Sequence, residues 1–142
     1  MKYRYLPHTA DVEFEAYGKT FKEAIENAAE AMLNVMLDLK KVKAEKAQEK
    51  QVEINDSAGS KEDLLWYTLQ DILTKTDEKA LHTYALKVKQ IKQKGSRLRL
   101  QGKLFYKKAD RDLSLLEIKA VTPYELSVEK KKQWIVRVVV DV

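Results

Sequence analysis

The sequence predicts an α+β fold, in which a single domain carries one mixed or antiparallel sheet of about six strands with two helices packed on one face. Two segments place apolar residues on one helical face, and several others alternate apolar and polar residues as half-buried strands do. The length of 142 residues fits one domain, since domains commonly hold about 100–150 residues. We therefore expect one domain over residues 1–142, without a linker or internal repeat.

The first predicted strand and helix lie in residues 12–36. Residues 12–17 alternate apolar and polar side chains, and Gly18 ends this strand. Thr20 and Glu23 have the spacing of a capping box, and apolar residues recur at helical spacing from Phe21 to Met36. This segment therefore predicts an amphipathic helix with Thr20 as its N-cap.

Gly18 and Lys19, which precede Thr20, resemble the end of a phosphate-binding loop. That motif needs a glycine five residues before the Gly-Lys pair, and the residue there is Glu13. A carboxylate at that position would repel phosphate, so we reject nucleotide binding through this segment.

The middle of the chain predicts a short strand around residues 52–54 after a polar connection over residues 40–50. A second helix follows, with Ser60 as N-cap and Asp63 three residues later. Residues 84–104 predict a long antiparallel hairpin that turns at Gly95 and Ser96.

The last third of the chain predicts three more strands, at residues 115–121, 124–129 and 134–140. The final strand is apolar on both faces, which is typical of a central strand. His82 lies between a helix and a strand, where we expect a surface or capping role.

The net charge of +5 is concentrated in one stretch. Residues 79–111 hold eleven lysines or arginines and one aspartate. Lys87, Lys89, Arg97 and Arg99 fall on the polar side of the predicted hairpin and would form one positive face. This face would suit RNA or an acidic partner surface. The alternative is that the lysines only solvate the sheet and protect its edge.

The chain has no cysteine, which excludes disulfide, iron–sulfur and thiol-nucleophile chemistry. No apolar stretch comes near the length of a membrane-spanning helix, which is about 20 residues. The N-terminus does not resemble a signal peptide. We therefore expect a cytoplasmic protein with no membrane partner.

Two acidic positions near opposite ends of the chain are candidate functional residues. Asp11, with His8, lies in the turn before the first predicted strand; the alternative is a turn closed by a local side-chain hydrogen bond. Asp141 and the α-carboxylate of Val142 end a buried strand, and a hard cation would relieve their repulsion. The alternative there is a frayed, solvated terminus.

These positions and their context resemble the archease family over essentially the whole chain. The matching segments are His8 to Val12, Ala29 to Met36, Leu64 to Leu65, Lys119 to Thr122 and Val139 to Val142. The combination of the His-Thr-Ala-Asp motif with a penultimate aspartate is specific, whereas either feature alone is weak.

The resemblance implies an archease-like fold and a protein that is not itself an enzyme. Archeases act with RtcB-type RNA ligases in tRNA splicing, where they promote guanylylation of the ligase and multiple turnover. The implied metal ligands are Asp11, Asp141 and Val142, with His8 as a neighbouring residue. Calcium is the implied ion, with magnesium or manganese as alternatives. The resemblance also implies a second function, as a chaperone or modulator of a tRNA cytosine-5 methyltransferase, with tRNA as a further partner.

Three features depart from the family pattern. Asn34 stands where an aspartate is common, which matters little on a helix face. Thr122 is followed by Pro123 and Tyr124, so a histidine that is common in the family is missing, and Tyr124 would keep an aromatic contact. The loop around Asp110 is shorter than in many members. A metal-dependent hydrolase is a third hypothesis, which we expect to fail because only His8 is available near the motif as a proton carrier.

Overall fold

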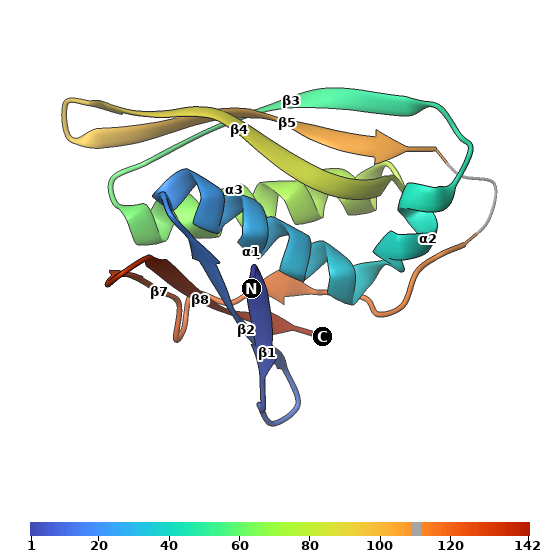
Figure 1. The fold of residues 1–142 in the computed structure, drawn as a ribbon, viewed down its shortest axis with the longest axis horizontal. Helices are drawn as coiled ribbons and strands as arrows, with labels where there is room; N and C mark the ends of the chain where they lie inside the picture. Colours follow the sequence, from blue (N-terminus) through green and yellow to red (C-terminus); the bar gives the residue numbers. More distant parts are fainter. Residues whose placement is uncertain (109–111) are drawn as a thin grey trace.

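The computed structural model describes residues 1–108 and 112–142 (Figure 1). Its elements are β1 (Tyr3–Leu6), β2 (Val12–Gly18), α1 (Phe21–Met36), α2 (Leu39–Ala44), β3 (Glu49–Ala58), α3 (Lys61–Glu78), β4 (His82–Lys94), β5 (Arg97–Lys107), β6 (Ala120–Val121), β7 (Ser127–Lys130) and β8 (Trp134–Asp141). Part of the loop around Asp110 lies outside the described residues. No helix in the described ranges is long and apolar enough to cross a membrane.

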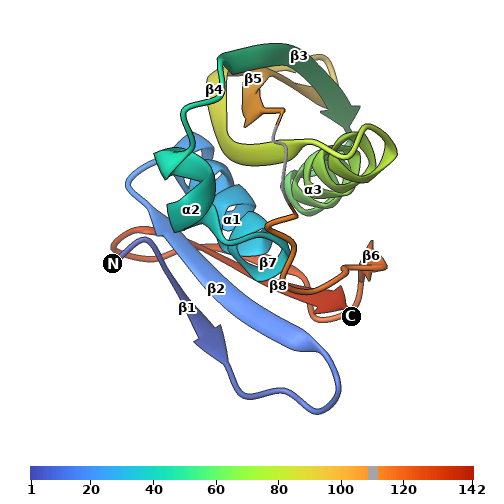
Figure 2. The same ribbon diagram turned by 90° about the vertical axis from the view of Figure 1, so that its right-hand side faces the viewer.

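The strands form two antiparallel sheets, with α1 and α3 between them (Figures 1 and 2). One sheet has the order β1-β2-β8-β6, with β7 also paired to β8, and the other has the order β3-β5-β4. The α+β class is confirmed, but the strands are divided between two sheets instead of forming one. Each sheet therefore has one face on the helices and one outer face.

The apolar surface of α1 explains the second sheet. Sequence spacing indicates one apolar stripe, which would cover one sheet. In the structure, α1 packs against β2 and β8 on one side and against β4 on another. Nine of its sixteen residues are buried, including Ala24, Ala28, Ala29 and Ala31. These small side chains let both sheets approach the helix closely.

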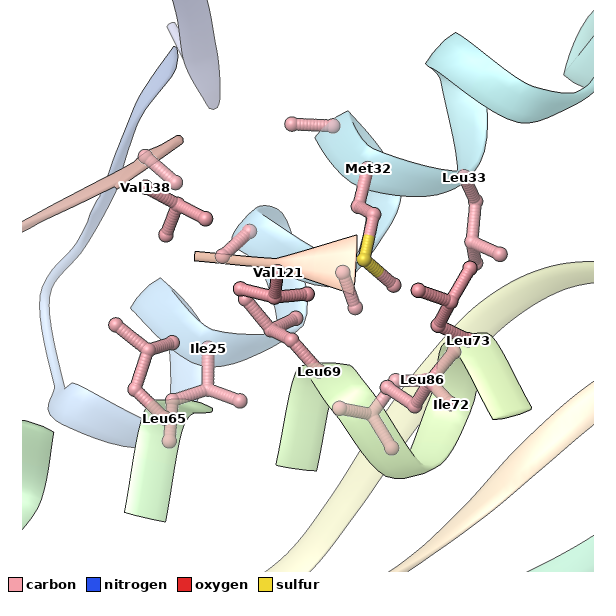
Figure 3. Close-up of a cluster of buried hydrophobic side chains, with 14 of the residues drawn as sticks. Ile25, Met32, Leu33, Leu65, Leu69, Ile72, Leu73, Leu86, Val121 and Val138 are labelled. Atoms are coloured by element: carbon pink, nitrogen blue, oxygen red, sulfur yellow. The ribbon is translucent and has the colours of Figure 1, made fainter. Parts of the chain in front are cut away.

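The core lies where the two helices meet the inner faces of the sheets. In Figure 3, Met32 and Leu33 of α1 lie near Leu69 and Leu73 of α3. The same cluster includes side chains from both sheets, such as Leu86, Val121 and Val138. This continuous apolar layer holds the two sheets at fixed positions relative to each other.

Both predicted helix caps are confirmed. Thr20 Oγ1 accepts a hydrogen bond of 3.1 Å from the Glu23 backbone N–H, and Ser60 Oγ accepts one of 3.1 Å from the Asp63 backbone N–H. Each bond satisfies an N–H group that has no partner within the first helical turn. The local sequence is therefore sufficient to start both helices.

Several boundaries differ from the predictions. The four-residue β1 was not predicted. The polar connection after α1 contains the short helix α2. Asp38 caps this helix by accepting a hydrogen bond of 3.2 Å from the Lys41 N–H. Only Ala120–Val121 is a strand where residues 115–121 were predicted, and β7 begins at Ser127. Short elements carry too few residues for a clear period, so tertiary pairing determines where they form.

Candidate metal centre

Strands β2 and β8 bring the predicted acidic residues of both ends of the chain together. The two strands are antiparallel, and Val12 at the start of β2 pairs with Val140 near the end of β8. Asp11 directly precedes Val12, and Asp141 directly follows Val140. Extending this register by one residue therefore places Asp11 beside Asp141.

The pleat of the sheet determines the face on which these residues lie. Val136, Val138 and Val140 are fully buried and face the helices. Successive side chains of a strand point to opposite faces. Asp141 therefore lies on the outer face of the sheet, and so does its register neighbour Asp11. The candidate centre is at the edge of this outer face, away from the core.

The end of β8 is held in place by backbone hydrogen bonds. Asp141 pairs with Ala120 of β6, and its carbonyl oxygen accepts a bond of 2.7 Å from the Lys119 N–H. Val142 packs against the core cluster. These contacts argue against a frayed terminus. They also leave the Asp141 side chain and a main-chain oxygen of Val142 as the oxygen donors of this end.

This donor set suits a hard divalent cation. Asp11 and Asp141 offer carboxylate oxygens and Val142 offers a main-chain oxygen, and oxygens of both kinds are ligands of Ca²⁺. Carboxylates on adjacent strands repel one another unless a cation or a proton lies between them. The chemistry of the residues is thus compatible with the predicted ion.

Basic residues neutralise the neighbouring glutamates of the same face. Arg137 Nε is 3.6 Å from Glu13 Oε1, and its Nη2 is 3.6 Å from Glu15 Oε2. Arg4 Nη2 donates to Glu15 Oε1 at 2.8 Å. Glu13 and Glu15 therefore have positive partners within the sheet.

The two candidate aspartates lack such partners. The described residues give Asp141 no ion pair, and Asp11 has one, in which its Oδ2 is 3.9 Å from His8 Nδ1. His8 also lies against Glu125, so one imidazole is shared between two acids. Among the described residues, Asp141 therefore has no positive partner and Asp11 has only this shared one.

His8 joins a second group of donors next to the predicted one. His8, Glu13 and Glu125 each offer one ligand atom, and these atoms lie within 4.8 Å of one another. The Nε2 atom of His8 is 3.3 Å from Glu125 Oε2. The pKa of His8 is raised: desolvation opposes the rise, and hydrogen bonds with Glu125 and with the Thr9 carbonyl outweigh it.

Sequence reasoning missed Glu13 and Glu125. Glu13 follows Asp11 by two residues, so the strand period was a usable signal for a shared face. Glu125 lies before β7 with a φ of 60°, and its approach to His8 depends on how β7 pairs with β8. No local pattern indicates that contact.

The remaining predicted residues lie elsewhere. Lys87, Lys89, Arg97 and Arg99 are exposed on the β3-β5-β4 sheet, on the other side of the helices from Asp141. His82 is buried instead of lying at the surface, with Nδ1 3.1 Å from Glu45 Oε1. The helix α2 that precedes Glu45 was not predicted, so this partner could not be foreseen.

The chain matches the model of the archease protein family (MTH1598/TM1083) over residues 3–142. It is 36% identical to a protein archease of Methanosarcina acetivorans, over 99% of this chain and 96% of that one. It is 31% identical to a protein archease of Pyrococcus furiosus, over 99% of each chain. These matches cover both parts of the candidate centre.

Two solved structures share the fold. The solution structure of Methanobacterium thermoautotrophicum protein 1598 superposes with a TM-score of 0.77 at 30% identity and covers 99% of each chain. The crystal structure of a Thermotoga maritima archease, described as a possible chaperone, superposes with a TM-score of 0.60 at 24% identity, over 96% of this chain and 94% of that one. With the family model matched from residue 3 to the last residue, the chain belongs to the archease family.

Proposed function

We propose that this protein is a cation-dependent activator of an RtcB-type RNA ligase, and that it does not join RNA itself. The pairing of Val12 with Val140 supports this proposal, because it brings Asp11 and Asp141 to one edge of the outer face. The proposed activity is promotion of ligase guanylylation and of multiple turnover, as the family resemblance implies.

Asp11, Asp141 and a main-chain oxygen of Val142 would hold the ion, for which calcium is the first candidate and magnesium or manganese the alternatives. When bound, the ion supplies concentrated positive charge on a surface that a partner can contact. Preorganised charge of this kind favours reactions in which phosphates develop negative charge.

In this proposal, the backbone would position these oxygens before any partner arrives. The bond between the Lys119 N–H and the Asp141 carbonyl holds the last strand, and the pairing of Val12 with Val140 holds the residue next to Asp11. His8 Nδ1 is 3.9 Å from Asp11 Oδ2, next to the proposed ligands. The cost of ordering the ligands is therefore met during folding and not during partner binding.

The test compares Asp11→Asn and Asp141→Asn with Glu129→Gln. Glu129 is an exposed acid on β7 of the same sheet, so its substitution removes one charge away from the candidate centre. We expect both aspartate variants to lose calcium binding in calorimetry and stimulation of multiple-turnover ligation, while Glu129→Gln retains both. Stimulation by either aspartate variant at the wild-type level would refute the proposal.

A second candidate function is chaperoning of a tRNA methyltransferase. Leu115 and Leu116 are 62% and 45% exposed, and Tyr124 is 80% exposed, which gives a partner apolar side chains to cover. The Thermotoga maritima relative is described as a possible chaperone. Under this function, Leu115→Ser with Leu116→Ser would stop the protein from keeping the methyltransferase in solution, and Asp11→Asn would have no effect.

A further inference from the structure

Seven basic residues share the outer face of the β3-β5-β4 sheet. All seven are exposed, and we call them the basic face: Lys87, Lys89, Lys92, Lys94, Arg97, Arg99 and Lys103. Within the described part of the chain, none of the seven takes part in an ion pair. In Figure 1 this sheet lies on the far side of the helices from the C-terminus.

Like charges lie directly opposite each other along the hairpin. The register pairs Lys87 with Lys103, Lys92 with Arg99 and Lys94 with Arg97. Like charges at directly opposed positions destabilise a sheet. Three such pairs in one hairpin indicate a cost to folding that a bound anion would remove.

Protection of the sheet edge does not account for this arrangement. Lysines on exposed edge strands discourage pairing with other chains, and β4 is an edge of the β3-β5-β4 sheet. However, β5 is the central strand, with a partner on each side. Arg97, Arg99 and Lys103 of β5 therefore have no edge to protect, and solvation alone would be served as well by neutral polar residues.

The basic face contains a shallow hollow of about 540 Å³. Its lining combines three lysines, three side-chain amides, one aromatic ring, one glycine and one acid, which are Lys87, Lys89, Lys103, Gln51, Asn55, Gln101, Phe105, Gly102 and Glu53. The amides offer hydrogen-bond donors and acceptors, and the ring of Phe105 is half-buried. Glu53 pairs with Lys103 across the strands and is the single acid of this lining.

A bulge in β4 adds a side chain to this hollow. Val88 pairs with Gly102 and Gln90 with Gln101, so Lys89 is an extra residue between two regular pairs. The Val88 N–H donates to Glu26 Oε2 of α1 at 2.8 Å, which satisfies the backbone where the pairing shifts. The helix therefore holds the irregular geometry that presents Lys89.

We propose that the basic face binds single-stranded nucleic acid. The cations would contact phosphates, the amides would contact base edges, and Phe105 would stack on a base; grooves for single strands combine these groups. An acidic protein surface would use the cations and leave the amides and the aromatic ring without a function. The inference is independent of the cation site, because it concerns the other sheet.

The test measures fluorescence anisotropy of a labelled 12-nucleotide single strand, as RNA and as DNA, against the full chain. The test variant carries both Arg99→Gln and Lys103→Gln. The control variant carries both Lys22→Gln and Lys132→Gln, which change the net charge by the same amount. Lys22 and Lys132 are exposed and lie outside the β3-β5-β4 sheet. We expect the first double variant to bind at least tenfold more weakly in 0.1 M salt, and the control to bind within about twofold of wild type.

Salt and stacking provide two further readouts. The slope of log K against log salt should fall by about 1.4 in the Arg99/Lys103 variant, because each phosphate that is no longer neutralised lowers the slope by about 0.7. Phe105→Leu should reduce the preference for a single strand over a duplex of the same length. The Arg99/Lys103 variant should melt close to the wild-type temperature, because it relieves two like-charge pairs and loses one opposed pair of opposite charge with Glu53. A melting temperature near that of wild type means that a loss of binding cannot be attributed to unfolding.

Each of four results would overturn the inference. These are no binding in 20 mM salt, an equal loss of binding in the control variant, tighter binding of polyglutamate than of the single strand, and equal affinity for duplex and single strand. The third result would indicate an acidic protein partner instead. Calcium binding at Asp11 and Asp141 would be unaffected by any of them, so the two proposals fail separately.

Discussion

Val12 lies directly opposite Val140 in the antiparallel pair of β2 and β8, and both side chains face the interior. Extending this register by one residue puts Asp11 and Asp141 at opposed positions on the outer face. If their carboxylates share one ion, as proposed, the stability of this sheet edge should depend on whether a cation is present.

The first prediction concerns the effect of Asp141→Asn on the melting temperature, which should change sign when calcium is added. In chelator, the variant should melt at or above the wild-type temperature, because it removes repulsion between adjacent carboxylates. With calcium at a hundredfold excess over its dissociation constant, wild type should gain about 2.7 kcal/mol and melt several degrees higher, and the variant should gain little. Differential scanning calorimetry with and without calcium measures both. Equal calcium shifts in wild type and variant would contradict the prediction.

The second prediction tests the layer between the two sheets. Leu69 of α3 is fully buried in the cluster of Figure 3, so Leu69→Ala should lower the free energy of unfolding by about 2–5 kcal/mol. Leu116→Ala is the control, because Leu116 is 45% exposed and its truncation should change stability by less than about 0.5 kcal/mol. Urea denaturation monitored by circular dichroism measures both. A loss of similar size in the two variants would mean that Leu69 is not a core residue.

The third prediction tests the anchored bulge of β4. Glu26→Ala removes the acceptor of the Val88 N–H and should cost about 1–3 kcal/mol, since a partly buried donor loses its partner. Glu26→Gln keeps a side-chain oxygen and should cost less. Amide hydrogen exchange at Val88 should accelerate in the alanine variant. Unchanged exchange there would show that the Glu26 carboxylate does not hold the bulge.

The sequence was most informative where local chemistry alone determines structure. The caps at Thr20 and Ser60 and the alternation of residues 84–104 predicted two helices and the long hairpin, and β8 is central as expected. The division into two sheets was not predictable from one apolar stripe on α1. It depends on alanines of that helix admitting strands on both sides, which is a tertiary property.

The candidate centre was predicted in part. Asp11 and Asp141 were candidates from their positions in the sequence, and the family resemblance implied that they hold one ion. The register of β2 and β8 is compatible with that set, which stays a prediction. Glu125 was not predictable, because its contact with His8 joins residues 117 positions apart through the pairing of β7. Long-range contacts of this kind leave no period in the sequence.

The last prediction concerns the pH dependence of stability and rests on Asp56. This residue lies on the inner side of β3, and its Oδ2 is buried with no hydrogen-bond partner among the described residues. Desolvation raises the pKa of Asp56 to about 7, and the nearby Asp71 carboxylate adds to the rise, while Lys75 opposes it. The ordinary value of this pKa is 3.8, which also describes the unfolded chain.

The direction in which stability changes with pH follows from proton binding to Asp56. Between pH 3.8 and about 7, the folded protein holds a proton on Asp56 that the unfolded chain has lost, so the contribution of Asp56 to stability decreases as pH rises through this window. Discounted for partial solvent access, the loss of stability is on the order of 1–2 kcal/mol.

Asp56→Asn should remove this decrease and stabilise the protein above pH 7. Glu53→Gln, on the outer side of the same strand, should leave the decrease in place. Urea denaturation at pH 5 and pH 8 measures the free energy of unfolding of wild type and both variants. If this free energy decreases equally in wild type and Asp56→Asn, groups other than Asp56 cause the decrease.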